Sequence, residues 1–259
     1  PAVNPGDAVR VSGLVSEFRA GGADGLANLT ITEIVQPELI VLSAGNALPE
    51  PILVGAGGRL PPGTAINPGD CGSVEQSACG FDPGTDGIDF WESLEGMRVR
   101  IDNALATGPT NDFGEISVVA DLGANAGPRT ARGGVRITAG DFNPERVLLD
   151  DGFMPMPRVN LGDSFPLVIG VLDYSFGNFK LQVTEPLTVA SGGLEREITR
   201  AQDQNQLAIA SFNVENLAPG DPPEKLAALA AQIVQNLRSP DIVALMEVQD
   251  NSGAANDGT

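Results

Sequence analysis

Histidine is absent from this sequence of 259 residues, and aromatic residues make up only 5% of it. Histidine is the side chain that most readily moves protons near neutral pH, so a catalytic site that depends on it is excluded within these residues. The single tryptophan, Trp91, and the single tyrosine, Tyr174, are expected in a core or at a barrel edge rather than as base-stacking platforms. No apolar run approaches the length of a membrane span.

Cysteine is almost as scarce as histidine. Cys71 and Cys79 are the only two, and both lie in the Gly- and Ser-rich segment CGSVEQSACG. Because a reduced thiol gains nothing from packing in a polar loop, this pattern favours a small disulfide-closed loop and an oxidising compartment. Two free thiols are the alternative. A zinc site is disfavoured, since two thiolates without histidine do not complete a tetrahedral shell.

Positive charge is also in short supply, because 15 Lys and Arg residues stand against 34 Asp and Glu residues, a net charge of −19. Such a surface repels polyanions, so a nucleic-acid partner would require divalent cations or a local basic patch. Acidity that only provides solubility is the alternative. The most basic stretch, GPRTARGGVRI, holds Arg129, Arg132 and Arg136, which could face phosphates on an OB-like surface or belong to a solvated loop.

Glycine (32) and proline (20) are plentiful and divide much of the chain into short strand-like runs. About five to seven such strands over roughly a hundred residues predict a small β-barrel or sandwich, so the fold class is mainly β. The predicted organisation is a partial OB-like β module at 1–56, a Gly/Pro/Cys-rich linker loop at 57–90, a second β-barrel module at 91–190, a linker at 191–204, and a different unit at 205–259.

A weak internal repeat underlies the expectation of two β modules. The segments GDAVRVSGLVSEF (6–18) and GDSFPLVIGVLDYSF (162–176) both run from Gly-Asp through an apolar strand to a glycine, an acid and an aromatic residue. The spacing from Gly-Asp to the later glycine differs by one residue, so a bulge or an insertion is needed to align them. Simple recurrence of a turn followed by a strand is the alternative.

After residue 205 the pattern changes to a β-α-β unit. QLAIASFNV (206–214) and DIVALMEV (241–248) have the composition of buried strands, and GDPPEKLAALAAQIVQNLRSP (220–240) between them has helical periodicity. Asp221 is expected to cap this helix, with Pro222 at the first helical position and Pro240 at its end. This is the only strong α/β signal in the chain.

Asn213 and Glu247 stand near the carboxyl ends of the two predicted strands. Because the strands of a right-handed β-α-β unit are parallel, both side chains reach the same edge of the sheet, where α/β folds place ligands. An amide oxygen and a carboxylate suit Mg²⁺, Mn²⁺ or Ca²⁺ better than zinc. The alternative is that Asn213 ends a strand and Glu247 is a solvated acid.

The motifs IASFNVENL and SPDIVALMEVQD resemble the first two motifs of the endonuclease/exonuclease/phosphatase superfamily, in their order and in the separation of 34 residues from Asn213 to Glu247. The upstream stretches DGIDFWESLEGMRVRI, ERVLLDDG and LVIGVLDYSFGNFKLQV are similar to the OB-like region ahead of the nuclease domain in large secreted bacterial nucleases. The resemblance implies a secreted enzyme that hydrolyses extracellular DNA or RNA, with DNA favoured, using Mg²⁺ or else Mn²⁺ or Ca²⁺.

The same resemblance assigns Asn213 and Glu247 to the metal site, with Glu247 binding the ion and Asn213 orienting a phosphate or a metal-bound water. The histidine motifs of this superfamily follow later in its chains, so no catalytic residue is assigned here and this stretch alone is expected to be inactive. A β module that binds nucleic acid or a cell-surface partner is one alternative. A phosphatase or phospholipid phosphodiesterase of the same superfamily is another, since the core does not fix the substrate.

Overall fold

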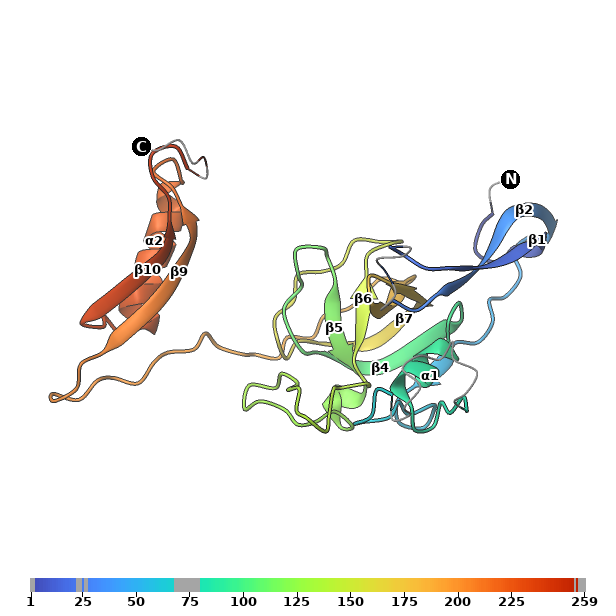
Figure 1. Cartoon of the computed structure of the whole chain (residues 1–259), viewed down its shortest axis with the longest axis horizontal. Helices are drawn as coiled ribbons and strands as arrows, with labels where there is room; N and C mark the ends of the chain where they lie inside the picture. The colour runs from blue at the N-terminus through green and yellow to red at the C-terminus, as the bar shows by residue number, and fades with distance from the viewer. Residues whose placement is uncertain (1–2, 22–24, 26–27, 68–79, 254, 256–259) are drawn as a thin grey trace. The chain divides into compact units, whose positions relative to one another are not determined.

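A computed structural model describes residues 3–21, 25, 28–67, 80–253 and 255, and it contains two compact units, Pro1–Leu194 and Glu195–Thr259 (Figure 1). The division falls inside the predicted linker at 191–204. Each unit has its own strands and its own hydrogen-bond pattern, and each is described by itself. Among the described residues, no helix combines the length and the apolar character required to cross a membrane.

The larger unit contains a closed five-stranded barrel, which confirms the mainly β, OB-like fold class. Three strands form an antiparallel meander, β8 then pairs in parallel with β6, and β7 pairs with both β8 and the first strand of the meander to close the sheet. This is the Greek-key closure of an OB-like barrel. Its strands are β4 (Arg98–Ala106), β5 (Ile116–Val119), β6 (Val147–Asp150), β7 (Ser164–Ser175) and β8 (Asn178–Val183).

The barrel interior is filled by apolar side chains that alternate with polar ones along the strands, as the two-residue period of a strand requires. β4 shows the pattern, with Val99 and Ile101 fully buried and Arg100 between them exposed. The short helix α1 (Gly87–Glu92) adds Phe90 and Trp91 to the same core. Its amino end is capped by Asp86, whose side chain accepts hydrogen bonds from the amides of residues 88 and 89.

Residues 1–56, expected to be part of a first barrel, form a two-stranded antiparallel ribbon and a short third strand. The ribbon pairs β1 (Ala8–Phe18) with β2 (Ile31–Ser43), and β3 (Ile52–Val54) adds to the barrel sheet in parallel with β4. Within the ribbon, Leu14 and Val15 are 68% and 66% exposed on neighbouring positions of one strand. A ribbon of two strands cannot cover both of its faces, so these apolar residues stay in contact with solvent.

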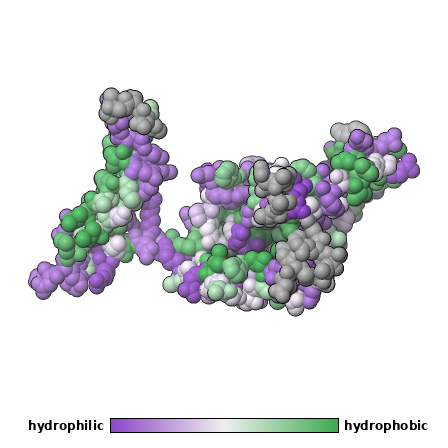
Figure 2. Space-filling view, viewed as in Figure 1, coloured by the Kyte–Doolittle hydropathy of each residue, from purple (hydrophilic) through white to green (hydrophobic). Residues whose placement is uncertain are grey.

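The smaller unit is the β-α-β arrangement that the sequence predicts. Strand β9 (Ile209–Leu217) pairs in parallel with β10 (Ile242–Val248), and α2 (Pro223–Ala231) continues into a π-helical turn, Gln232–Asn236, before the chain reaches β10. Apolar side chains such as Ile209 and Ile242 remain at least half exposed, and hydrophobic surface is visible along this unit in Figure 2.

The predicted start of the helix is wrong by one residue. Pro222, not Asp221, occupies the N-cap position, because its backbone is extended and Pro223 is the first helical residue. Asp221 instead accepts a hydrogen bond from the amide of Ala218 at 2.9 Å and pairs with Lys225 at 2.9 Å. These two contacts fix the turn before the helix, and they lower the pKa of Asp221 through the amide of Ala218 first and Lys225 second.

The barrel core predicts a large stability difference between two phenylalanines. Phe165 is fully buried and Phe113 is 79% exposed. We expect Phe165→Ala to lower the free energy of unfolding by about 3–5 kcal/mol, because it leaves a cavity among packed side chains. Phe113→Ala should change it by less than about 0.5 kcal/mol. Urea unfolding followed by the fluorescence of Trp91 measures both values, and equal losses would contradict the assigned core.

Candidate functional site

The structure brings together the two residues that the sequence places in a metal site. In the parallel ladder, Asn213 on β9 lies opposite Met246, the residue immediately before Glu247 on β10. The Nδ2 atom of Asn213 donates a hydrogen bond of 2.6 Å to Oε1 of Glu247. The predicted juxtaposition at the carboxyl ends of the two strands is therefore present in the folded unit.

The orientation of the Asn213 amide is fixed by its second hydrogen bond. The backbone N–H of Glu215 donates to Oδ1 of Asn213 at 2.7 Å, so Oδ1 must be the acceptor and Nδ2 must face the carboxylate. The oxygen that was expected to act on a phosphate or a metal-bound water is thus engaged within the chain. In this arrangement, Asn213 acts as the residue that positions Glu247.

The backbone around this pair adopts a conformation that non-glycine residues rarely take. Glu215, Asn216 and Glu247 have φ values of 55°, 54° and 61°. The ladder slips at the same place, since Met246 lies opposite Asn213 but Val248 lies opposite Leu217. Each left-handed residue costs roughly 1–2 kcal/mol, and such strain tends to concentrate at functional sites. Three such residues therefore lie together at this edge of the sheet.

Additional polar groups surround the Asn213–Glu247 pair. The Nε2 atom of Gln249 donates to Oδ1 of Asn216 at 2.7 Å, across the two strands. Lys225, on the first turn of α2, donates to the backbone carbonyl of Glu215 at 2.8 Å. The edge therefore offers the exposed carboxylates of Glu215 and Glu247, several amides and one nearby ammonium group.

The donor set at this edge fits a hard divalent cation only in part. Among the described residues there is no group of three or more acidic or cysteine side chains around one point. A carboxylate such as Glu247 can still hold Mg²⁺, because Mg²⁺ commonly keeps several waters and binds through one or two carboxylates together with substrate phosphates. Mn²⁺ has similar ligand preferences. This donor set would suit only an ion that keeps most of its own water ligands.

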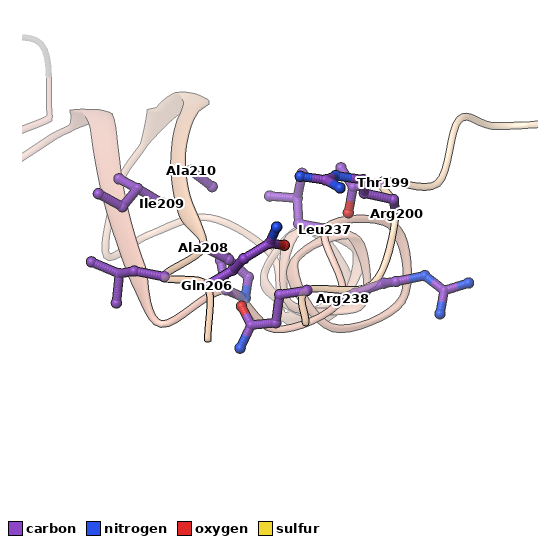
Figure 3. A pocket seen from close by; sticks show the side chains of 11 residues that line it. Thr199, Arg200, Gln206, Ala208, Ile209, Ala210, Leu237 and Arg238 are labelled. Atoms are coloured by element: carbon purple, nitrogen blue, oxygen red, sulfur yellow. The ribbon is translucent and has the colours of Figure 1, made fainter. Parts of the chain in front are cut away.

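The opposite end of this unit has an open pocket of about 500 Å³ near the start of β9 (Figure 3). It is lined by residues of the segment before β9 and by the end of the helical region, among them Arg200, Gln206, Leu237 and Arg238. Because Asn213 and Glu247 lie toward the carboxyl ends of the strands, this pocket is separate from them. It shares no lining residue with the strained edge.

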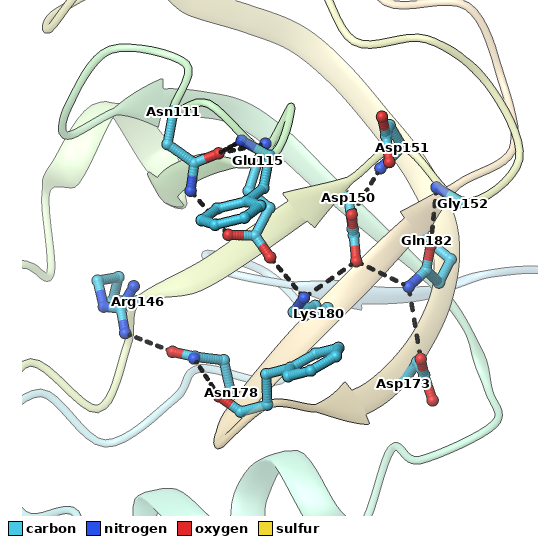
Figure 4. Close-up of polar contacts among 12 residues, drawn as sticks. Asn111, Glu115, Arg146, Asp150, Asp151, Gly152, Asp173, Asn178, Lys180 and Gln182 are labelled. Atoms are coloured by element: carbon cyan, nitrogen blue, oxygen red, sulfur yellow. Dashed lines mark hydrogen bonds and ion pairs between the residues drawn. The ribbon is translucent and has the colours of Figure 1, made fainter. Parts of the chain in front are cut away.

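On the barrel, a buried lysine organises a polar network (Figure 4). Lys180 on β8 is 4% exposed and contacts the carboxylates of Glu115 and, at 3.3 Å, Asp150. Burial by itself would lower the pKa of Lys180, but the hydrogen bond to Glu115 and the charge of Asp150 outweigh burial and raise it. The Nδ2 atom of Asn111 donates a hydrogen bond of 2.8 Å to Oε2, the second carboxylate oxygen of Glu115.

Gln182 extends the network along β8. Its Nε2 atom lies 3.1 Å from Asp150 and 3.4 Å from Asp173, and its oxygen accepts from the amide of Gly152 at 3.2 Å (Figure 4). The acids of this network therefore compensate the charge of Lys180, and Gln182 provides hydrogen bonds to the neighbouring polar groups. We interpret it as a structural feature of the barrel wall.

Two exposed phenylalanines, Phe113 and Phe176, occupy the loops that follow β4 and β7. These connections correspond to the loops after the first and fourth barrel strands, with which OB folds bind ligands. Phe176 is 86% exposed, has a φ of 50° and lies in the two-residue turn between Ser175 and Asn178. Gly, Asn or Asp normally fills such a turn position, so a bulky residue there is an outlier.

Sequence reasoning overlooked this aromatic pair. It considered only Trp91 and Tyr174, which are 3% and 6% exposed and belong to the interior, as predicted. A signal for the missed pair was present, because each of Phe113 and Phe176 directly precedes a glycine in a turn between two strands. An aromatic residue at a tight turn has few neighbours that could cover it.

The arginine stretch is divided by the structure into structural and exposed members. The Arg129 guanidinium donates to the carbonyl of Gly133 at 3.0 and 2.9 Å and to the carbonyl of Leu122 at 3.2 Å, so it holds two loop segments together. Its expected role in phosphate binding stays a prediction that would rest on the remaining guanidinium donors. Arg132 and Arg136 are exposed and keep that role as a prediction.

Cys71 and Cys79 lie outside the described residues, so the disulfide stays a prediction.

Comparison with known proteins gives one match. Residues 53–191 match a family described as a domain of unknown function, DUF8508, and these residues make up more than half of the chain. The chain belongs to the DUF8508 family. The DUF8508 region begins within β3 and ends just after the barrel, so the β1–β2 ribbon and the β9–β10 unit lie outside it. No curated protein and no solved structure matches the chain significantly.

The strained edge predicts an unusual response to glycine. Glycine adopts a positive φ without penalty, so Glu247→Gly should leave the β9–β10 unit as stable as before or stabilise it by up to about 1 kcal/mol. Ala244→Gly, in the same strand, should destabilise it by about 0.5–1 kcal/mol. Amide hydrogen exchange across β9 and β10 measures both effects. Faster exchange in Glu247→Gly than in Ala244→Gly would argue against strain at Glu247.

Proposed function

We propose that the chain is part of a secreted, metal-dependent enzyme that hydrolyses phosphodiester bonds of extracellular nucleic acid. The observation that carries this proposal is the 2.6 Å hydrogen bond between Asn213 and Glu247 at the carboxyl ends of two parallel strands. The strained backbone at Glu215, Asn216 and Glu247 supports it, because strain of this kind is retained where geometry matters more than stability.

In this proposal, Glu247 holds a divalent cation, Mg²⁺ in the first place, and Asn213 keeps the carboxylate in the binding orientation. The bound ion would stabilise the negative charge that develops on the phosphate. Lys225 lies near the same edge, where it donates to the Glu215 carbonyl at 2.8 Å, but its charge is paired with Asp221 at 2.9 Å.

Proton transfer is the part of the chemistry that these residues do not provide. The 259 residues contain no histidine, and the described residues around Asn213 and Glu247 include no buried acid that could replace it. We therefore expect the ion-binding step without turnover from this stretch of chain. A phosphatase or phospholipid phosphodiesterase remains compatible with the same ion-binding pair, because the pair contacts no substrate-specific group.

The metal site is tested with Mn²⁺ as a spectroscopic probe. Glu247→Gln should abolish Mn²⁺ binding at this edge, and Asn213→Ala should weaken it by about 10–100-fold, since it removes the partner that orients the ligand. Glu224→Gln, an exposed acid on α2, is the matched control and should bind as the unmodified chain does. Electron paramagnetic resonance titration measures the affinity.

The result that would overturn the metal site is equal Mn²⁺ binding by Glu247→Gln and Glu224→Gln. Incubation of the unmodified chain with DNA, RNA, phospholipid and phosphate monoesters in the presence of Mg²⁺ tests the rest. No turnover is expected for any of them. Mg²⁺-dependent cleavage by this histidine-free chain would contradict the expectation that these residues bind the ion but do not provide proton transfer.

A binding module without catalysis is a second candidate, favoured by the exposure and strain of Phe176. In this function, Phe113 and Phe176 would stack against planar ligand groups such as single-stranded bases. The wall beside them carries Glu115, Asp150 and Asp173, so a polyanion would need divalent cations to approach. Arg132 and Arg136 are the exposed cations that could assist on the barrel.

The two candidates are distinguished by gel retention of single-stranded DNA across a salt series, with and without Mg²⁺. If the barrel binds nucleic acid, Phe113→Ala combined with Phe176→Ala should weaken retention, at about 1–3 kcal/mol for each base that loses its stacking partner. Replacing Arg132 and Arg136 with Ala should flatten the salt dependence. Glu247→Gln is the control that should leave this binding unchanged. No salt-dependent retention would exclude the binding module.

A further inference from the structure

The loop that leads into β6 contains three buried polar side chains at alternate positions. Asp141, Asn143 and Glu145 are 6%, 6% and 4% exposed, in a chain whose acidic residues are mostly in contact with solvent. Asn143 has a φ of 54°, which bends the loop between the two acids. Burial of two carboxylates within five residues requires compensation, because a buried charge without a partner is strongly unfavourable.

Three oxygens of this loop have no hydrogen-bond partner among the described residues. They are Oδ1 of Asn143 and both carboxylate oxygens of Glu145. The amide orientation of Asn143 is fixed, because its Nδ2 donates to the carbonyl of Arg136 at 3.2 Å and the reverse orientation would place two oxygens together. Asp141 contributes one oxygen to the amide of Asn143 at 2.9 Å. Buried acceptors without donors indicate that a positive ligand is needed.

The charges around Glu145 do not cancel. Burial is the main cause that raises the pKa of Glu145 to about 7, and the charge of Asp141 raises it further, while the amides of Glu145 and Gly127 and the charge of Arg146 lower it. Those amides do not reach hydrogen-bond geometry with the carboxylate. The Arg146 guanidinium donates to Asn178 at 3.1 Å, and its charge acts on both Glu115 and Glu145, so it is not a dedicated partner of Glu145.

We propose that Asp141, Asn143 and Glu145 bind a calcium ion. A divalent cation satisfies oxygen acceptors that a single proton on Glu145 would leave unpaired, and it balances the charges of both carboxylates. Carboxylate and amide oxygens are hard donors, and water would complete the coordination shell of a Ca²⁺ ion held by these three side chains. Calcium is favoured over Mg²⁺ because the oxygens are buried and Mg²⁺ gives up its water reluctantly.

This site is separate from the strained edge of the β9–β10 unit and belongs to the DUF8508 barrel. The loop is held against α1, because Nε1 of Trp91 donates to the carbonyl of Pro144 at 2.7 Å. A β-carbon added at Gly87 would lie 2.4 Å from the Pro144 ring, so the two segments are in close contact. A bound ion would therefore fix the loop on the helix that supplies part of the barrel core, and the only tryptophan of the chain lies next to it.

The position of Trp91 allows a selective test with Tb³⁺, which replaces Ca²⁺ and emits when excited through a nearby indole. We expect tryptophan-sensitised Tb³⁺ emission from the unmodified chain, displaced by Ca²⁺ at lower concentration than by Mg²⁺. Glu145→Gln should weaken this binding by about tenfold or more, the scale of losing an interaction that supports a metal ligand. Glu50→Gln, an exposed acid of the same unit, is the control and should bind normally.

Thermal unfolding provides a second readout with a defined sign. Because the pKa of Glu145 is raised from 4.5 to about 7, the penalty for its buried charge appears as pH rises through this window and is complete above it. Ca²⁺ should therefore raise the melting temperature more at about pH 8 than at about pH 5. Glu145→Gln should melt higher than the unmodified chain without Ca²⁺ at the higher pH and should lose the Ca²⁺ response.

Two results would overturn the proposal without any variant. One is the absence of tryptophan-sensitised Tb³⁺ emission from the unmodified chain. The other is a melting temperature that depends on pH in the same window but not on Ca²⁺, which would assign the compensation of Glu145 to a proton. A Ca²⁺ response that survives in Glu145→Gln but disappears in Glu247→Gln would move the ion to the β9–β10 unit and also contradict the site at Glu145.

Discussion

The pairing of β4 with β7 is the interaction on which the barrel depends. It joins Arg98 to Val171 at one end and Leu105 to Ser164 at the other, across some sixty residues of intervening chain. Without it, the five strands would form an open sheet with two unpaired edges. With it, the apolar faces of all five strands enclose one core.

Closure of the barrel also explains how an acidic chain with few aromatic residues keeps buried polar groups. Lys180 lies in the wall with Glu115 and Asp150, and each member of this group has a charged partner. Glu145 differs, because it is buried without a matching donor. Two buried ionisable side chains of the same unit therefore have opposite physical roles. The charge of Lys180 is compensated by carboxylates in the barrel wall, whereas Glu145 is an acceptor without a donor and favours a ligand.

Local patterns in the sequence were sufficient for the strands, the β-α-β unit and the contact between Asn213 and Glu247. They were not sufficient where the outcome depends on neighbours distant in the chain. The Arg129 guanidinium binds carbonyls of two loop segments, which no spacing of arginines reveals. The burial of Glu145 depends on the packing of its loop against α1, where Trp91 donates to the carbonyl of Pro144. The helix also begins one residue later than predicted, because the Asp221 carboxylate accepts a hydrogen bond from the amide of Ala218 in the turn before the helix.

The way the chain enters and leaves the barrel has a mechanical consequence. On entry, β3 pairs with β4 from Val99 to Ile101, and on exit Ala190 bridges to Ser164, which itself pairs with Leu105. Tension applied between the flanking segments would therefore be carried mainly by β4 and the first residues of β7, and β5 and β6 would bear little of it. The barrel would resist pulling as a short shear joint, so the segments on either side can move without opening the core.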